Sequence, residues 1–427
     1  MSHFLKDFSR LASTPLRRDA LTILEAGLDG VDTATCLRRV MVREGENVRI
    51  GQQKYDLSQY TNVFVIGIGK AAYAAAQFVE EVLGDKITDG VILDVTGGPL
   101  KHLTSRIGTH PYPSLQNMKA TGEMIGILRH LEPTDLLVMI ISGGGSAMLC
   151  WPTSLTCGQI TKLTEELMRS GATIEEINIV RKHTSDVLGG QVAAMAHPTP
   201  IVGLVFSDVP GDNFATIASG PTVMDISTKQ DAEKVLDKYN LREACQLPDC
   251  EVLETPKDEK MFEHVYNMRV VSNIDAIHAM EEVATSLGYK VRSLGTEVTG
   301  EARELGKKMA SEIQPGEAII GGGETTVTIV GNGKGGRNQE VVLGALEDLP
   351  EGALILSCAS DGIDRAEVAG AFIDDQIKEN IIKKKLSSEE YLKNNDSLNF
   401  FKKAGGHIVT GPTNRNVSDL FLIIRPH

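Results

Sequence analysis

A short apolar run, a glycine-rich corner and a helix-like stretch recur along this chain. The unit first occurs at Val63–Ala72 (VFVIGIGKAA) and again at Leu136–Leu149 (LLVMIISGGGSAML), and Pro200–Asp212 begins in the same way. Continuous apolar runs are typical of strands that are buried on both faces, as in parallel sheets. Their alternation with helices predicts βαβ units joined by right-handed crossovers, and hence an α/β fold.

Two series of these units predict two α/β domains, within the two or three that 427 residues correspond to. Ahead of the first series, helical spacing predicts helices over Ala20–Leu28 and Ala34–Val42. The pattern lapses over residues 246–266, a polar, charged segment with two prolines that is typical of a boundary. We therefore predict an N-terminal domain over residues 1–250 and a C-terminal domain over residues 265–427. The second series comprises Val270–Asn273, Tyr289–Leu294, Glu317–Val330, Ala353–Gly362 and Leu420–Ile424.

Composition excludes several classes of protein. The formal net charge of -14 argues against a general nucleic-acid surface, although a cleft can carry local cations for an anionic substrate. Six cysteines without a CxxC pair indicate reduced thiols rather than a zinc knuckle. The N-terminus lacks the apolar run of a signal peptide, and Leu136–Ile141 is too short to span a bilayer. We expect a cytoplasmic protein that binds neither nucleic acid nor membrane. The sequence leaves open whether it forms a homodimer.

The first glycine corner, Gly67–Ala72, has two functional interpretations. It matches the GxGxxA dinucleotide fingerprint, in which Asp94 at the end of the next strand would meet a ribose. Alternatively, Lys70 is a cation at the mouth of the helix, aimed at a transferring phosphoryl group. A tight turn with a surface lysine is the structural alternative.

The second corner, Ser142–Ser146, places three glycines between two hydroxyl groups and predicts an anion nest. It is not a Walker A loop, since no GKS or GKT follows, and it lacks the final glycine of a serine-hydrolase elbow. A tight packing turn remains the alternative. His110 and His183 are also candidates for a cleft, but a hydrogen-bonded structural role is the preferred interpretation of both.

The most phosphate-like loop lies in the second half. Residues 331–336 contain four glycines, and Lys334 and Arg337 lie within and just after them. Arginine is suited to bidentate contact with phosphate or carboxylate. Acids stand at several predicted strand ends, where they can hold magnesium or serve as turn and cap residues. The candidate magnesium ligands are Asp208, Asp212, Glu324 and Asp361.

Eight ordered motifs, spread over nearly the whole chain, resemble the class II glycerate kinases, which are glycerate 2-kinases of the MOFRL and DUF4147 family. They are Val65–Ala72, Ile141–Ala147, Ile177–His183, Ser207–Asp212, Ala218–Pro221, Gly322–Thr326, Gly333–Glu340 and Thr410–Thr413. The resemblance implies a Rossmann-like parallel α/β/α sandwich, a second, smaller α/β domain, and an active site in the cleft between them. It also implies ATP, Mg²⁺ and transfer to the 2-hydroxyl of glycerate, with Lys70 and Arg337 in catalysis.

Two loops depart from the family pattern. The family often has an acid where this chain has Ser114, and Arg365 stands where the family has a glycine. The second departure lies in Asp361–Gly370 and leaves room for an acceptor related to glycerate, such as another small hydroxy acid or sugar acid. A nicotinamide-dependent hydroxypyruvate reductase is the enzyme alternative, and a sensor on an inactivated kinase scaffold is the non-enzyme alternative.

Phosphoryl transfer depends on positioning and charge neutralisation, which assigns a role to each candidate. Lys70 and Arg337 would stabilise the transferring phosphoryl group, and Asp208 is the candidate to accept the hydroxyl proton. The expected nucleotide-binding residues are Gly67, Gly69, Ser142, Gly143, Gly144, Gly145, Ser146, Gly333, Lys334, Gly335, Gly336 and Asn338.

Overall fold

The computed structural model describes residues 3–247 and 250–427, which form two compact units. Thr33–Ser207 and Asp212–Val270 make up the parallel-sheet unit. The residues up to Asp32, Asp208–Gly211 and Val271–His427 make up the mixed-sheet unit. The predicted fold class, with two α/β domains, is confirmed. The units differ from the predicted domain ranges because residues up to Asp32 and Asp208–Gly211 belong to the mixed-sheet unit, and because the parallel-sheet unit continues to Val270.

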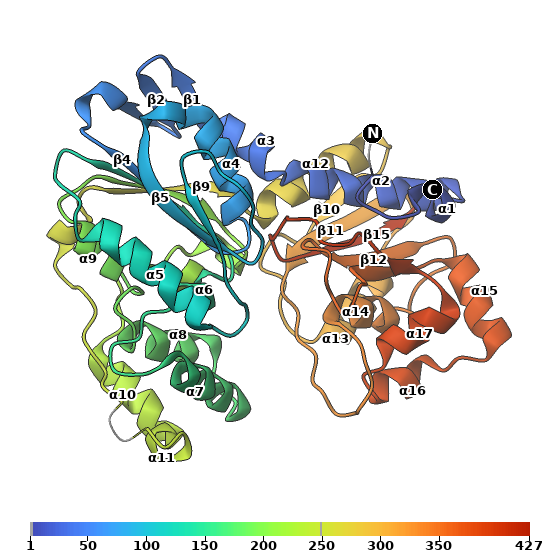
Figure 1. Cartoon of the computed structure of the whole chain (residues 1–427). Coiled ribbons are helices and arrows are strands. Elements are labelled where there is room, and N and C mark those ends of the chain that lie inside the picture. The colour runs from blue at the N-terminus through green and yellow to red at the C-terminus, as the bar shows by residue number, and fades with distance from the viewer. Residues whose placement is uncertain (1–2, 248–249) are drawn as a thin grey trace. The chain divides into compact units, whose positions relative to one another are not determined.

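The parallel-sheet unit is built on a six-stranded sheet with strand order β6-β5-β4-β7-β8-β9 (Figure 1). The pairs β5–β6, β4–β5, β4–β7 and β7–β8 are all parallel. Its strands are β4 (Val63–Ile68), β5 (Ile87–Asp94), β6 (Thr104–Ile107), β7 (Leu136–Ile141), β8 (Ile201–Phe206) and β9 (Val265–Val271). The fully apolar runs β7 and β8 are buried at every position, as expected for inner strands of a covered sheet.

The order of these strands contains a reversal. From β4 the chain adds β5 and β6 on one side, and then returns to add β7 and β8 on the other. The switch point therefore lies between the carboxyl ends of β4 and β7, which is where open α/β sheets bind their ligands.

Helices of this unit cover the sheet or form a separate apolar cluster. They are α3 (Thr33–Val40), α4 (Ala72–Leu83), α5 (Leu115–Leu128), α6 (Gly145–Met148), α7 (Cys157–Arg169), α8 (Ile174–His183), α9 (Gln191–Ala196), α10 (Lys229–Lys238) and α11 (Leu241–Ala244). Helix α4 contacts β4, β5 and β7, and α5 contacts β5. Helices α7, α8, α10 and α11 pack around Leu163, Ile177, Leu236 and Leu241 instead.

Residues 41–56 form an antiparallel sheet that the sequence analysis missed. Its strands are β1 (Met41–Glu44), β2 (Asn47–Ile50) and β3 (Gln53–Asp56). The predicted helix ends at Val40, because Gly45 and Gly51 adopt positive φ in the two turns that follow.

The mixed-sheet unit has the strand order β10-β11-β15-β12-β13-β14. Only β10–β11 is parallel among its described pairs; the others are antiparallel. The strands are β10 (Lys290–Ser293), β11 (Glu317–Gly323), β12 (Leu354–Ala359), β13 (Gly370–Ile373), β14 (His407–Ile408) and β15 (Asp419–Arg425). Its helices are α1 (Phe8–Leu11), α2 (Pro15–Gly30), α12 (Asn273–Ser286), α13 (Ala302–Glu312), α14 (Arg337–Gly344), α15 (Asp375–Lys384), α16 (Ser388–Lys393) and α17 (Ser397–Ala404).

The N-terminal helix α2 belongs to this C-terminal unit. It packs against α12 and β15, and Figure 1 shows the blue α2 beside the yellow α12. A Cβ atom at Gly27 would lie 2.8 Å from Met280 Cγ, so glycine permits this close approach. Conversely, β9 completes the parallel-sheet unit next to β8, where Ile201 N donates to His264 O at 2.9 Å. The polar segment over 246–266 therefore lies within one unit, apart from residues 248–249, which are outside the described residues.

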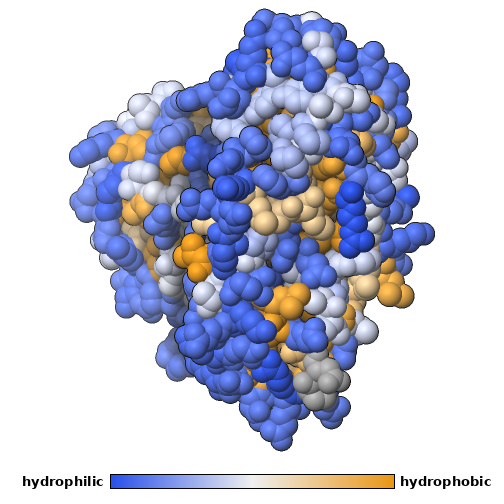
Figure 2. Space-filling model, turned by 90° about the vertical axis from the view of Figure 1, so that its left-hand side faces the viewer, coloured by the Kyte–Doolittle hydropathy of each residue, from blue (hydrophilic) through white to orange (hydrophobic). Residues whose placement is uncertain are grey.

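In the described parts of the chain, no helix combines the length and apolarity needed to cross a bilayer. On the face shown in Figure 2, hydrophilic residues cover most of the surface and apolar residues form separate patches. All six cysteines are free and buried, as the sequence analysis predicts for reduced thiols.

Candidate active site

The first two glycine corners meet at the switch point of the parallel sheet. Lys70 N donates to Gly143 O at 2.9 Å, which ties the corner after β4 to the corner after β7. The Ser142 hydroxyl donates to Ile68 O at 3.0 Å and accepts from Ala71 N at 3.1 Å. Ser142 is therefore a buried structural link, rather than a hydroxyl that faces a ligand.

Close backbone approach explains two of the glycines. Gly69 has φ +103°, and a Cβ atom there would lie 2.3 Å from Ser142 Oγ. Gly144 has φ +81°, and its Cβ would lie 3.0 Å from His110 Cδ2 and 3.4 Å from Lys70 Cγ. Both positions require glycine. The second contact also shows that Lys70, His110 and the Ser142–Ser146 corner lie together.

Only one of the two corners has amide groups available for an anion. In the first corner, Gly69 N donates to Leu93 O and Ala72 N to Gly69 O, in addition to the bonds of Lys70 N and Ala71 N. In the second corner, the amides of Gly143, Gly144 and Ser146 donate to no other residue that the structure describes. The anion nest predicted at Ser142–Ser146 is thus geometrically available, whereas Gly67 and Gly69 serve the packing of the corner.

Asp94 has a structural role. It is 1% exposed, accepts from Tyr73 N at 2.9 Å and from Thr96 N at 3.0 Å, and so binds the first-turn amide of α4. Because the carboxylate is buried and binds two backbone amides, a ribose hydroxyl would reach it only after local rearrangement. Together with the occupied amides of the first corner, this geometry disfavours the dinucleotide interpretation of Gly67–Ala72.

The two histidines have different surroundings. His183 is buried, and its Nδ1 lies 2.6 Å from Leu253 O, which agrees with the structural interpretation. His110 is exposed on one side and lies beside Lys70. Desolvation on its inner side, followed by the charges of Lys70 and Arg181, lowers the pKa of His110 to about 4. Its imidazole is therefore neutral at pH 7.

Arg181 is the cation of this region that the sequence analysis did not identify. It stands in Arg181-Lys182-His183 at the end of α8, where basic residues are common because they complement the helix dipole. Because a helix-end arginine needs no functional explanation, the sequence gives no sign that Arg181 lies near His110. Only the fold brings the two residues together. Burial lowers the pKa of its guanidinium.

In the mixed-sheet unit, Arg337 is held by two carboxylates. Its Nε lies 2.5 Å from Asp419 Oδ2 and its Nη1 2.8 Å from Glu324 Oε1. Gly323 at the end of β11 pairs with Asp419 at the start of β15, so the antiparallel register brings these acids to one edge. Asp419 is fully buried, and burial raises its pKa to about 6 although Arg337 and Asn338 lower it. An acid directly before the apolar run LFLII was the signal for Asp419.

The glycine-rich loop at 331–336 packs against its own unit. Gly333 N donates to Asn394 O and Lys334 N donates to Asp396 Oδ1, both at 2.8 Å. A Cβ atom at Gly336 would lie 2.2 Å from the Asp364 carboxyl carbon.

Asp364 in turn accepts from the amides of Asn338 and Gln339, at 3.0 and 3.1 Å, and so caps α14. A polar pocket opens beside this loop, lined by Glu324, Thr326, Gly335, Gly336 and Arg337 among others. Phosphate cradling by Gly333, Lys334 and Asn338 through these amides would require rearrangement, whereas Gly335 and Gly336 border an open pocket.

The four candidate magnesium ligands do not form one cluster. Asp212 is ion-paired with Arg269 at 2.8 Å in the parallel-sheet unit, and Glu324 with Arg337 in the mixed-sheet unit. Asp208 accepts from Asn416 Nδ2 at 3.0 Å, and Asp361 accepts from Ile363 N at 2.9 Å, also in the mixed-sheet unit. Within 3–247 and 250–427, no group of three or more His, Cys, Asp or Glu is arranged to hold a metal.

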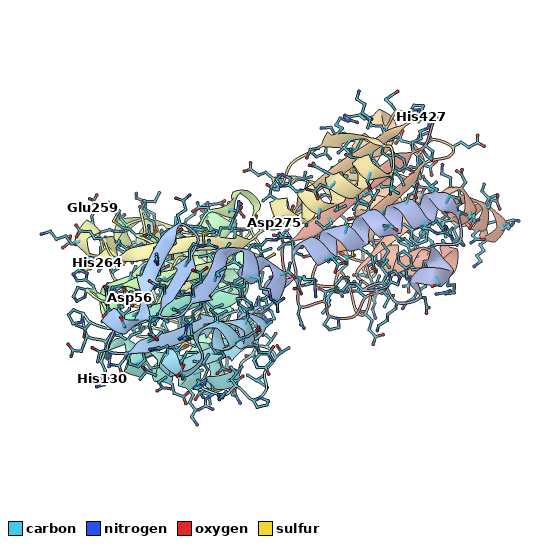
Figure 3. All side chains as sticks on the ribbon, turned by 90° about the horizontal axis from the view of Figure 1, so that it is seen from above. Asp56, His130, Glu259, His264, Asp275 and His427 are labelled. Atoms are coloured by element: carbon cyan, nitrogen blue, oxygen red, sulfur yellow. The ribbon has the colours of Figure 1, made fainter. Side chains whose placement is uncertain are left out.

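Other titratable side chains lie at the margin of the parallel-sheet unit, where Figure 3 labels Asp56, His130, Glu259 and His264. His130, Glu259 and His264 are exposed. They make no second cluster comparable to Lys70, His110 and Arg181.

Comparison with known proteins identifies the family. Residues 19–253 match the domain of unknown function DUF4147, and residues 317–419 match the MOFRL family. A D-glycerate 2-kinase of Thermotoga maritima is 37% identical, with 84% of this chain and 90% of that protein covered. A glycerate 2-kinase of Pyrococcus horikoshii is 36% identical, with 85% and 87% covered. Two Agrobacterium vitis relatives, 34% identical over 84% of this chain, carry a hydroxypyruvate reductase name.

Structural similarity agrees with the sequence matches. The crystal structure of a glycerate kinase from Thermotoga maritima superimposes with a TM-score of 0.82 at 33% identity, with 96% of this chain and 99% of that chain covered. The DUF4147 region precedes the MOFRL region in this chain, and together the two regions contain the eight motifs of the sequence analysis. The protein therefore belongs to the class II glycerate kinases, kinases in which a DUF4147 region is followed by a MOFRL region.

Proposed function

We propose that this enzyme transfers the γ-phosphoryl group of ATP to the 2-hydroxyl of glycerate, giving 2-phosphoglycerate. The observation that carries the proposal is the switch-point corner, where Lys70 lies against Gly144 beside amides that have no partner among the described residues. Backbone amides and a cation together match the needs of a transferring phosphoryl group, which spreads negative charge over its oxygens. The names of the relatives support glycerate as acceptor.

The proposal gives each candidate residue a role in phosphoryl transfer. Lys70 would neutralise charge on the phosphoryl group, while the amides of Gly143, Gly144 and Ser146 would bind phosphate oxygens. Arg337 would contribute a second cation, because Glu324 is exposed and a phosphate can compete with it, whereas Asp419 keeps the guanidinium in place. Asp208 remains the candidate to accept the hydroxyl proton.

Mg²⁺ fits the acids present only if it is bound together with the nucleotide. Magnesium usually takes one or two carboxylates in addition to substrate phosphates, so a cage of protein ligands is unnecessary. The candidate ligands remain Asp208, Asp212, Glu324 and Asp361. The ion would have to compete with Arg269 for Asp212 and with Arg337 for Glu324. When bound, the ion supplies charge neutralisation to the phosphates.

The state of the cysteines is consistent with a reaction that uses ATP in the cytoplasm. All six thiols are free, which suits a reducing compartment that also holds ATP, and we place the reaction in the cytoplasm.

The test measures ADP release from ATP and glycerate, with and without Mg²⁺, and assigns the product by phosphorus NMR. Lys70→Ala is expected to lower kcat by at least about 10³-fold, on the scale of a lost transition-state cation. Lys86→Ala is the matched control, because Lys86 lies at the surface and is paired with Glu46 in the same unit. NADH consumption with hydroxypyruvate, or near-normal activity of Lys70→Ala, contradicts the proposal.

A further inference from the structure

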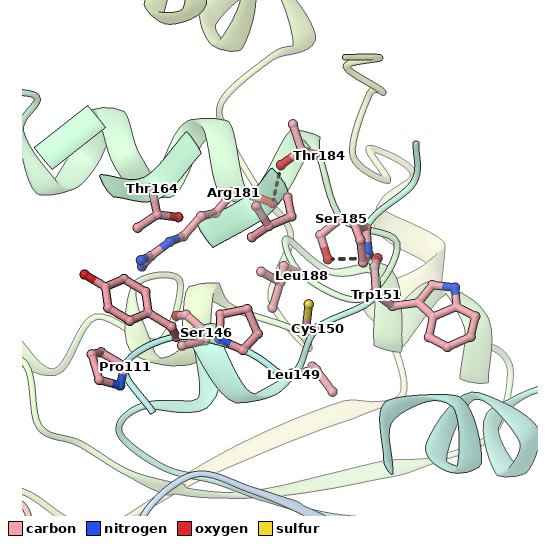
Figure 4. Close-up of a pocket in the computed structure, with 15 residues that line it drawn as sticks. Pro111, Ser146, Leu149, Cys150, Trp151, Thr164, Arg181, Thr184, Ser185 and Leu188 are labelled. Carbon is pink, nitrogen blue, oxygen red and sulfur yellow. Dashed lines mark hydrogen bonds between the residues drawn. The ribbon is translucent and has the colours of Figure 1, made fainter. Parts of the chain in front are cut away.

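A pocket in the parallel-sheet unit opens next to the second glycine corner (Figure 4). Its walls are mainly apolar and include Leu149, Trp151 and Leu188, and Ser146 joins it to the corner. Among the described residues that line it, Arg181 alone is charged. Ligand pockets are typically apolar with a few polar groups that fix the ligand's orientation, and an arginine among them favours an anionic ligand.

Arg181 has no carboxylate partner among the described residues. Its neighbour Lys182, by contrast, is paired with Asp225, with Nζ 3.1 Å from Oδ1. A buried charge normally has a counter-ion, because desolvation without one is costly. Desolvation lowers the pKa of the Arg181 guanidinium, as expected for a cation that has no nearby carboxylate to stabilise its charge.

The guanidinium points into the pocket. In Figure 4, it extends from α8 into the space between Thr164 on one side and Ser146 and Pro111 on the other. The hydroxyl groups of the pocket lining come from Tyr112, Ser146, Thr164, Thr184 and Ser185. Lys70 lies at the adjoining corner, and the charges of Lys70 and Arg181 both act on His110.

We propose that Arg181 binds the carboxylate of the acceptor, so that this pocket is the subsite for a short 2-hydroxy carboxylate. The proposal rests on the proposed function and names the residue that recognises the acid group. A planar guanidinium accepts a carboxylate in a bidentate manner. Ser146 links the pocket to the amides of the second corner, so a carboxylate held by Arg181 leaves the hydroxyl directed to the side of Lys70. The apolar walls exclude long or highly polar acceptors.

The experiment compares wild type, Arg181→Met and Arg181→Lys, with Arg169→Met as the matched control. Arg169 is a surface arginine on α7 of the same unit, paired with Glu166. Arg181→Met is expected to raise KM for glycerate about 100-fold or more, on the scale of a lost bidentate charge-assisted contact, and to leave KM for ATP within about twofold. Arg181→Lys should lie between, and Arg169→Met should equal wild type.

Two further measurements separate recognition from a structural role. Glyceramide lacks the carboxylate, so wild type should use it poorly and Arg181→Met should no longer discriminate between it and glycerate. Without ligand, Arg181→Met should melt at the same temperature as wild type or higher, since a partly buried charge without a carboxylate partner among the described residues has been removed. The stabilisation of wild type by glycerate alone should be lost. A lower melting temperature with unchanged KM for glycerate, or a rise in KM for ATP instead, overturns the proposal.

Failure of the proposed function can be told apart from failure of this subsite. If wild type does not phosphorylate glycerate, thermal shifts of wild type and Arg181→Met with glycerate, lactate and malate still test the subsite. Loss of a carboxylate-induced shift in the variant supports it, and equal shifts, or none in either protein, overturn it.

Discussion

Replacing Arg337 by alanine would leave the buried Asp419 carboxylate with one side-chain donor. Asp419 is fully buried and accepts from Arg337 Nε at 2.5 Å, from Arg337 Nη2 at 3.3 Å and from Asn338 Nδ2 at 2.8 Å. Removing one partner of a buried ion pair costs about 3–5 kcal/mol. The Arg337 side chain is 35% exposed and Asn338 remains, so we expect the lower end, about 3 kcal/mol at pH 8.

The loss should depend on pH. Burial raises the pKa of folded Asp419 from 3.8 to about 6, so the folded state binds more protons between these values and stability falls as pH rises through them. Arg337 opposes this rise. In Arg337→Ala, the pKa of Asp419 is higher still, and stability continues to fall above pH 6. The two proteins should therefore differ little near pH 5 and most at pH 8.

Thermal unfolding followed by circular dichroism at pH 5 and pH 8 measures the effect. For a unit of this size, 3 kcal/mol corresponds to roughly 6–12 °C in Tm. Arg337→Ala/Asp419→Asn should recover most of the loss at pH 8, because no unpaired carboxylate remains, but should stay inactive in ADP release. Equal melting temperatures of wild type and Arg337→Ala at pH 8, or a double variant no more stable than the single, would refute the reasoning.

Two further substitutions test the corner at the switch point. Gly69→Ala places a Cβ 2.3 Å from Ser142 Oγ at φ +103° and should lower Tm by more than about 5 °C, whereas the control Gly126→Ala, which meets no atom within 4 Å, should leave Tm unchanged or raise it; equal effects would contradict the packing role. Asp94→Ala removes the acceptor of Tyr73 N and should cost about 1–2 kcal/mol of unfolding free energy, as loss of a helix cap does; a changed KM for ATP without loss of stability would instead place Asp94 at the nucleotide.

Structural features that depend on contiguous residues were predictable from the sequence. Apolar runs identified the inner strands, because burial on both faces leaves no polar position in β7 or β8. Glycine corners identified the ends of β4 and β7, because positive φ and close backbone approach at Gly69 and Gly144 require that residue. The family followed from the order of such motifs, and both family regions confirm it.

Predictions failed where a residue's partner is distant in sequence. One failure was local instead: a helix was expected to run to Val42, but residues from Met41 onward form strands joined by turns at Gly45 and Gly51. The lapse in pattern at 246–266 suggested a boundary, but β9 pairs with β8 after it. Asp94 was compatible with ribose contact until its bond to the first-turn amide of α4 was known.

The sequence by itself determined the two α/β series, the corners with Lys70 and Arg337, and membership of the kinase family, since each is encoded in contiguous residues. Tertiary structure alone decided that α2 belongs with the C-terminal residues, that Asp419 holds Arg337, and that Arg181 stands near Lys70 in a pocket without an acid partner among the described residues. The reason is that strand order and helix packing join residues about 80 to 250 positions apart, and desolvation and charge act through space and not along the chain.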